Sequence, residues 1–122
     1  MKFEAFLVWA TNSEMPAGHD YKPVLEDVRK KLEELPLKWE KYFEVNRQSL
    51  AISERQSGNV VLSAKCEIAV KDLDGRSVEV SLIGKGKPVL KRIQPLPAGE
   101  MLVLGGNAPD STGWLVVLKR LK

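Results

Sequence analysis

Few side chains in this 122-residue chain are suited to nucleophilic or acid–base chemistry. His19 is the single histidine, Cys66 is the single cysteine, and no Gly-x-Ser-x-Gly segment is present to hold a nucleophilic serine. Cys66 lies within an alternating apolar pattern, which predicts an inert buried thiol rather than a reactive thiolate. One cysteine also excludes an intramolecular disulfide and a multi-cysteine zinc site. We therefore expect a non-enzyme that needs no cofactor and no metal.

Two segments have a partial likeness to ligand-binding loops. The segment Asp72-Leu73-Asp74-Gly75 begins like a calcium loop, but the later acidic ligands are missing at the required spacing. The segment Gly84-Lys85-Gly86-Lys87 offers flexible backbone and two cations, but it lacks the spacing of a phosphate-binding loop and no helix follows it. We interpret the first segment as a hairpin turn and the second as a break in a strand.

Charge is unevenly distributed along the chain, whose net charge is +3. Residues 80–122 carry seven Lys/Arg and two Asp/Glu, whereas residues 1–79 carry 12 and 14. A basic half can bind nucleic acid or another anionic polymer, and the residues that we expect to make such contacts, or contacts with a protein partner, are Lys85, Lys87, Lys91 and Arg92. The same surface could be extended by Lys119, Arg120 and Lys122.

Binding of single-stranded nucleic acid also needs aromatic side chains on which bases stack, and only Trp114 lies in the basic half. Edge protection and solubility are the alternative roles of these lysines.

The elements that position these cations follow from periodicity. The length predicts one domain over residues 1–122, with a strand at 3–11, a helix at 23–35 and strands through 37–122. The helical stripe has steps of three, four and three, and it consists of Leu25, Val28, Leu32 and Leu35. Pro23 is expected in the first helical turn. The connection is long enough for the strands at 3–11 and 39–45 to pair in parallel.

Apolar parity sets the expected faces and turns of the later strands. It changes from odd to even between Val45 and Leu50, which requires a bulge or break within residues 46–49. Even positions from Val60 to Val70 alternate without a break, which predicts one strand. A three-residue loop Leu73-Asp74-Gly75 would place Val70 opposite Val78, with Gly75 left-handed and Asp72 paired with Arg76. Pro88 lacks an N–H, so the strand at 89–94 is expected at a sheet edge.

The closing stretch, residues 99–121, is predicted to form a hairpin at the centre of the core. Residues 101–104 and 114–118 are apolar at every position, which indicates burial on both faces. The nine residues from Gly105 to Gly113 have turn chemistry. Apolar runs do not exceed five residues, too few to span a bilayer.

Together these patterns predict an α+β fold: a mostly antiparallel curved sheet, sandwich or partial barrel of five to seven strands with one amphipathic helix packed on it. The leading functional hypothesis is a non-catalytic protein-binding or assembly module that recruits another protein, or a second copy, through an exposed sheet edge. The alternative is a basic-surface binder of nucleic acid or another anionic polymer. A third hypothesis is a small-molecule or lipid carrier with a pocket between helix and sheet.

Several motifs together carry a likeness to known proteins. Residues 7–12 (LVWATN) precede the expected helix, residues 41–45 (KYFEV) follow it, and residues 96–100 (LPAGE) lead into the closing hairpin. This pattern resembles small β-rich domains of bacterial exported or envelope-associated proteins with no established activity. The resemblance implies an exported or periplasmic location if a leader has been removed, and a cytoplasmic one otherwise. It transfers no catalytic residue.

Overall fold

A computed structural model describes residues 1–12, 22–35, 39–63, 66–84, 87–107 and 113–122. Its secondary structure comprises one helix, α1 (Glu26–Glu33), and strands in the following order. They are β1 (Lys2–Thr11), β2 (Lys22–Pro23), β3 (Lys41–Ala51), β4 (Ser57–Ser63), β5 (Cys66–Asp72), β6 (Ser77–Gly84), β7 (Lys87–Pro95), β8 (Met101–Asn107) and β9 (Gly113–Arg120). No helix in these ranges is long and apolar enough to cross a membrane.

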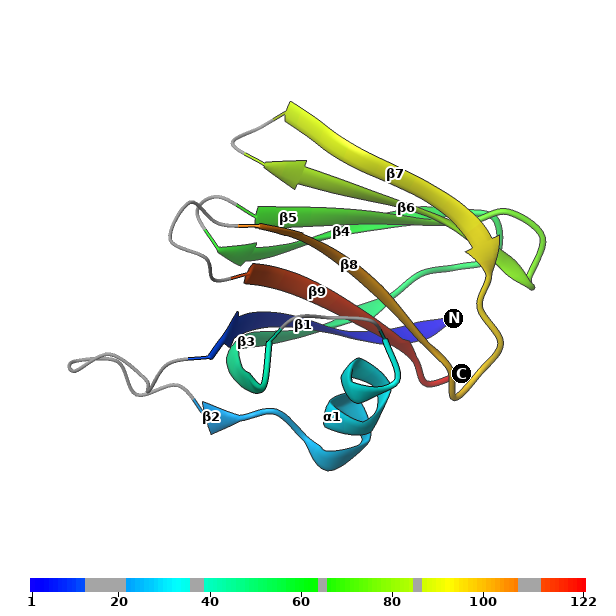
Figure 1. The fold of residues 1–122 in the computed structure, drawn as a ribbon. Helices are drawn as coiled ribbons and strands as arrows, with labels where there is room; N and C mark the ends of the chain where they lie inside the picture. The colour runs from blue at the N-terminus through cyan, green and yellow to red at the C-terminus, as the bar shows by residue number, and fades with distance from the viewer. Residues whose placement is uncertain (13–21, 36–38, 64–65, 85–86, 108–112) are drawn as a thin grey trace.

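The strands form two antiparallel sheets that pack face to face (Figure 1). One sheet has the order β2-β3-β1-β9-β8 and the other has the order β4-β5-β6-β7. Helix α1 covers the face of the five-stranded sheet that is turned away from the four-stranded sheet (Figure 1). The described elements therefore form three layers, with the five-stranded sheet in the middle, and the two sheets do not close into a barrel.

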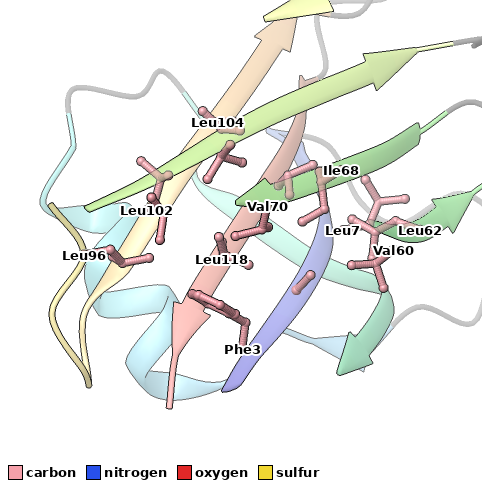
Figure 2. Close-up of a cluster of buried hydrophobic side chains, with 14 of the residues drawn as sticks. Phe3, Leu7, Val60, Leu62, Ile68, Val70, Leu96, Leu102, Leu104 and Leu118 are labelled. Atoms are coloured by element: carbon pink, nitrogen blue, oxygen red, sulfur yellow. The ribbon is translucent and has the colours of Figure 1, made fainter. Parts of the chain in front are cut away.

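The main core lies between the two sheets, where side chains from both sheets point toward one another (Figure 2). Phe3 and Leu7 of β1 and Leu118 of β9 face Ile68 and Val70 of β5. All five side chains are buried. Because the side chains of a strand alternate between faces, the apolar residues at the intervening positions point toward α1, namely Phe6, Val8 and Ala10 of β1 and Leu115 and Val117 of β9.

The second core lies between the middle sheet and α1. Val28 and Leu32 of the helix pack with Phe6, Val8 and Val117. Residues 115–118 of β9 are thus buried on both faces, which confirms the prediction from their apolar run. The same prediction for residues 101–104 is wrong for one face, because Met101 and Val103 of β8 are only partly buried. β1 is also buried on both faces. The closing hairpin is confirmed as well, although β8 is an edge strand of its sheet and only β9 is interior.

The helix is shorter than the predicted range 23–35. It begins after Leu25 and ends at Glu33, and Pro23 pairs with Phe43 in the short ladder between β2 and β3 instead of opening the helix. Leu25 is 39% exposed, so only Val28 and Leu32 of the predicted stripe are fully buried. An ion pair of 2.5 Å between Asp27 and Lys119 also joins the helix to β9.

The parallel pairing that the connection length allowed is wrong. β1 and β3 are antiparallel neighbours, and Thr11 at the end of β1 lies opposite Lys41 at the start of β3. The end of β1 and the start of β3 therefore lie at the same end of the sheet. The connection that contains α1 needs no crossover, because antiparallel neighbours can be joined at one end. The strand count of five to seven is also too low, because β2 was not predicted and residues 57–72 form two strands rather than one.

Two irregularities keep the apolar residues on the correct face. In β3, Asn46 pairs with Leu7 and Glu44 pairs with Val8, which leaves Val45 as an extra residue. The predicted bulge is therefore present, one residue earlier than expected. Between β4 and β5 the register shifts from Ser63 opposite Cys66 to Val60 opposite Ile68. Without this shift, residues of unlike parity would face each other and core positions would oppose solvent positions.

The β5–β6 turn differs from the predicted register by two residues. Val70 lies opposite Val80, and Leu73 N–H donates to Ser77 O, so the loop is Asp74-Gly75-Arg76. Both registers keep apolar residues together, because they differ by an even number of positions. Gly75 is left-handed as predicted, with φ of +83°. The expected Asp72–Arg76 pair is not formed.

Asp72 is instead a buried carboxylate that joins two turns. Its Oδ1 accepts from Gly75 N–H at 2.7 Å and its Oδ2 accepts from Arg55 N–H at 3.0 Å. Arg55 has a positive φ of 59°, a conformation that is unfavourable for arginine. The hydrogen bond that its N–H donates to Asp72 helps to hold this conformation. These two bonds lower the pKa of Asp72 in the folded protein.

We expect Asp72→Asn to lower the free energy of unfolding by about 1–2 kcal/mol at neutral pH, because an amide cannot accept both bonds as a carboxylate does. A lowered pKa stabilises the fold above the unfolded pKa of about 3.9, and this contribution is lost as the pH falls through the folded value. Urea unfolding at neutral pH and near pH 2 should therefore show a gap between the variant and wild type that shrinks in acid. Glu54→Gln, at an exposed carboxyl group, is the control. An equal gap at both pH values would contradict this role.

Candidate functional site

Three of the four candidate contact residues lie on one strand. Lys87, Lys91 and Arg92 belong to β7, and Lys85 lies outside the described residues. β7 is the last strand of the four-stranded sheet, on the far side of β6 from β5, and it forms the outer margin of the molecule (Figure 1). The edge position predicted from Pro88 is therefore confirmed, and the candidate residues follow an open sheet edge.

The hydrogen-bond pattern shows which backbone groups of β7 point to that edge. Leu96 N–H donates to Arg76 O, and the same register pairs Arg92 with Val80 and Gln94 with Val78. In an antiparallel ladder, bonded and non-bonded pairs alternate. From Leu90 to Leu96, even-numbered residues therefore bond to the β6 side, whereas the N–H and C=O groups of Lys91 and Ile93 point away from the sheet.

Lys91 stands at the middle of this edge. Its Nζ lies 3.0 Å from Glu79 Oε1 on β6, and its side chain is still 63% exposed. An exposed ion pair of this kind contributes about 0–1 kcal/mol. Because an ammonium group has three donors, Lys91 can donate to a second carboxylate without losing its bond to Glu79.

Arg92 lies on the opposite face of the strand, opposite Val80, which faces the inter-sheet core. Its Nη1 donates to Val103 O of β8 at 3.4 Å. The guanidinium group thus reaches from the edge of one sheet to the edge of the other. Arg92 is a link between the sheets as well as a surface cation.

Two exposed apolar side chains on β7 were missed by sequence reasoning. Val89 is 67% exposed and Ile93 is 60% exposed, the highest values among the large apolar residues in the described ranges. Val89 is the extra residue of a bulge, because Leu82 pairs with Leu90 and Ile83 pairs with Pro88. Alternation of Val89, Lys91 and Ile93 on odd positions was the available signal.

The other edge strands, β4, β8 and β2, make more contacts with neighbouring segments along their edges than β7 does. On β4, Leu62 O accepts from Asn46 Nδ2 of β3 at 2.8 Å, and β3 passes alongside this strand. On β8, Val103 O accepts from Arg92. The strand β2 lies along part of β3. Among the described residues, β7 therefore offers the most accessible edge.

The remaining cations of the basic half do not extend the β7 surface. Lys119 pairs with Asp27 on the helix side of the middle sheet, and the pKa of Asp27 is lowered by this hydrogen bond. Arg120 donates to Leu96 O at 2.8 Å, Gly75 O at 3.2 Å and Lys122 O at 3.1 Å. The expectation of one basic surface is wrong for these two residues, because each is committed to a contact that holds elements together.

A groove of about 420 Å³ opens beside β2, α1 and the start of β3. It is lined by Pro23, Val24, Arg29, Glu40, Lys41, Tyr42 and Phe43. Arg29 lies 3.8 Å from Glu33, and Tyr42 Oη donates to Trp39 O at 2.9 Å. The apolar interface between helix and sheet is filled by the side chains of the second core. The groove therefore lies at the surface rather than between the two layers.

The residues considered for catalysis are not brought together in the described part of the chain. Cys66 is half-buried beside the main core, and burial raises the pKa of its thiol, which disfavours the nucleophilic thiolate. His19 lies outside the described residues. Within those ranges no group of three His, Cys, Asp or Glu side chains could hold a metal ion. Trp114 is 42% exposed but belongs to β9 of the other sheet.

Comparison of the chain with models of protein families, with curated proteins and with solved structures finds no match, so the resemblance to exported bacterial domains stays a prediction.

Proposed function

We propose that this protein is a non-catalytic module that binds another polypeptide along the free edge of β7. The observation that carries the proposal is the combination of outward backbone groups at Lys91 and Ile93 with the exposed side chains of Val89 and Ile93. A strand added at such an edge gains main-chain hydrogen bonds from the backbone and specificity from alternate side chains.

A polypeptide partner is favoured over a nucleic acid by what surrounds the cations. β7 contains no aromatic residue on which a base could stack, and Trp114 lies in the other sheet. Lys91 is already paired with Glu79, which weakens a purely electrostatic site. Apolar side chains such as Val89 and Ile93 contribute to binding a strand and contribute little to binding phosphates.

Another molecule is also favoured over a second copy of this chain. Two β7 strands pairing edge to edge would bring Lys87, Lys91 and Arg92 of one copy near those of the other. Like charges on adjacent strands are destabilising, and edge lysines and prolines commonly prevent such self-pairing. The same cations attract a partner of opposite charge.

The test uses two substitutions at one position. Ile93→Pro removes an outward N–H without removing a bond to β6, whereas Ile93→Ala keeps this N–H and loses the side chain. Peptides selected from a random decapeptide library against the wild-type protein should bind Ile93→Pro about tenfold more weakly than Ile93→Ala. A carbonyl of the peptide is then left without its donor, at a cost of about 1–1.5 kcal/mol.

Circular dichroism must show that both variants keep the wild-type fold. Equal binding by Ile93→Pro and Ile93→Ala, or a selection that yields no binder, would contradict the proposal. Binding of a single-stranded oligonucleotide that weakens steeply with salt and is insensitive to Ile93→Pro would instead support the anionic-polymer alternative.

A further inference from the structure

We propose that β7 accepts an acidic strand, with a carboxylate opposite Lys91 and apolar residues two positions before and two positions after it. This inference rests on the function proposed above, and it specifies the chemistry of the partner. The juxtaposition behind it is a lysine between two exposed apolar side chains on the outer face of an edge strand.

The first argument is charge. β7 carries Lys87, Lys91 and Arg92 and no acidic residue. Glu79 on β6 is the only carboxylate among the described residues that pairs with them, and it contacts Lys91 alone. An added strand would lie on the side of β7 opposite to β6, and no described carboxylate pairs with Lys87 or Arg92.

The second argument is alternation. Val89, Lys91 and Ile93 occupy odd positions, and Lys91 and Ile93 share the outer face with Ser81 and Glu79 of β6. Side chains directly opposite each other on neighbouring strands have Cβ atoms about 4.5–5.5 Å apart. A partner residue opposite Lys91 is therefore within reach of its ammonium group, and the residues two positions away meet Val89 and Ile93.

The third argument is length. Pro88 and Pro95 lie near the two ends of β7 and lack N–H groups. The register places Pro95, like Lys91 and Ile93, at a position whose backbone groups point away from β6. A strand added at this edge would therefore find no N–H donor at Pro95. A short segment centred on Lys91 uses all the outward groups between the two prolines. The prolines thereby favour one register, which keeps the carboxylate opposite the lysine.

The test is a titration of ¹⁵N-labelled protein with three synthetic peptides, followed by NMR. The matched peptide is Thr-Val-Thr-Glu-Thr-Val-Thr. The second peptide has lysine in place of glutamate. The third, Thr-Val-Glu-Thr-Thr-Val-Thr, has the same composition but places the glutamate on the face opposite the valines. The matched peptide should shift the amides of Lys91 and Ile93 and bind about tenfold more tightly than either control.

A charge swap provides a second readout that keeps the internal ion pair. In the double variant Glu79→Lys with Lys91→Glu, the two residues can still pair, but the edge residue is now acidic. The preference should then reverse, with the lysine peptide binding more tightly than the glutamate peptide. Lys91 is 63% exposed and Glu79 is 24% exposed, and the swapped pair keeps one charge of each sign, so the fold should be retained.

The outcomes separate this inference from the proposed function. Equal binding of the glutamate and lysine peptides, or no reversal in the swapped variant, would overturn the acidic-strand inference. If library binders depend on the Ile93 N–H but lack the acidic pattern, the inference fails and the proposed function stands. If no binder depends on β7, both fail.

Discussion

Gly113→Val is expected to be among the most destabilising substitutions in the chain, lowering the free energy of unfolding by about 3 kcal/mol. A Cβ atom built on Gly113 would lie 2.5 Å from Cζ2 of Trp39, far inside van der Waals contact. Trp39 is buried in the core beneath the sheet, together with Ala10, the β1 residue that pairs with Gly113. Its indole cannot move without disturbing that core, so the extra side chain must strain it.

A double-mutant cycle identifies the indole as the cause. Trp39→Leu alone should also destabilise the protein, because it leaves space in the core. Combined with Gly113→Val, however, it should cost less than the sum of the two single substitutions, since valine then occupies space that the indole has left. Urea unfolding monitored by circular dichroism measures all four proteins. Strict additivity would show that the two residues do not compete for this space.

Arg120→Ala is expected to cost about 2–3 kcal/mol of unfolding free energy, a large effect for a residue near the end of the chain. The Arg120 guanidinium donates to the carbonyls of Gly75 in the β5–β6 turn, Leu96 in the β7–β8 connection and Lys122. Leu96 is almost fully buried. Removing the side chain leaves three carbonyls without their charged donor and loosens three segments at once.

Two further variants show whether geometry or charge is responsible. Arg120→Lys keeps the charge but cannot reach three carbonyls in different directions, so it should recover less than half of the loss. Arg29→Ala removes an exposed cation from α1 and should cost below about 0.5 kcal/mol. Thermal unfolding compares them. If Arg120→Ala were no worse than Arg29→Ala, Arg120 would be a surface cation, as the sequence alone had suggested.

The parts of the fold that the sequence predicted are those with strong local periodicity. The double-sided burial of β9 follows from an apolar run without alternation, and the edge position of β7 follows from Pro88. The bulge in β3 was required by a change of parity. In each of these cases a single residue or a short run contains the physical cause.

The errors concern features that depend on contacts distant in sequence. The β5–β6 register has two solutions with equal apolar matching, and in the observed one Asp72 accepts from Arg55, 17 residues earlier in the chain. Gly105 was placed in a loop, yet it pairs with Leu115, whose side chain occupies the space where a Cβ would lie. Glycine is therefore needed at this position because a strand neighbour packs against it, and not because a turn requires its backbone flexibility.

The candidate site could be predicted in composition but not in geometry. Lys87, Lys91 and Arg92 were identified from the charge asymmetry, and the structure places them on one edge strand. Lys119 and Arg120 have the same charge and lie close to the chain end, but Asp27 and the carbonyls of distant turns engage them. Charge counts cannot distinguish a cation that faces solvent from one that holds two elements together.

The most direct test of the account is amide hydrogen exchange along β7, measured with and without a peptide selected from the library. In the free protein, Lys91 and Ile93 N–H should exchange rapidly, because they point away from the sheet, while Arg92 and Gln94 N–H, bonded to β6, should exchange slowly. Binding should slow the exchange of the Lys91 and Ile93 amides at least tenfold. Each amide gains one hydrogen bond of about 1.4 kcal/mol, which corresponds to a factor of ten in the exchange rate. Unchanged exchange at these two amides in the complex would contradict strand addition at β7.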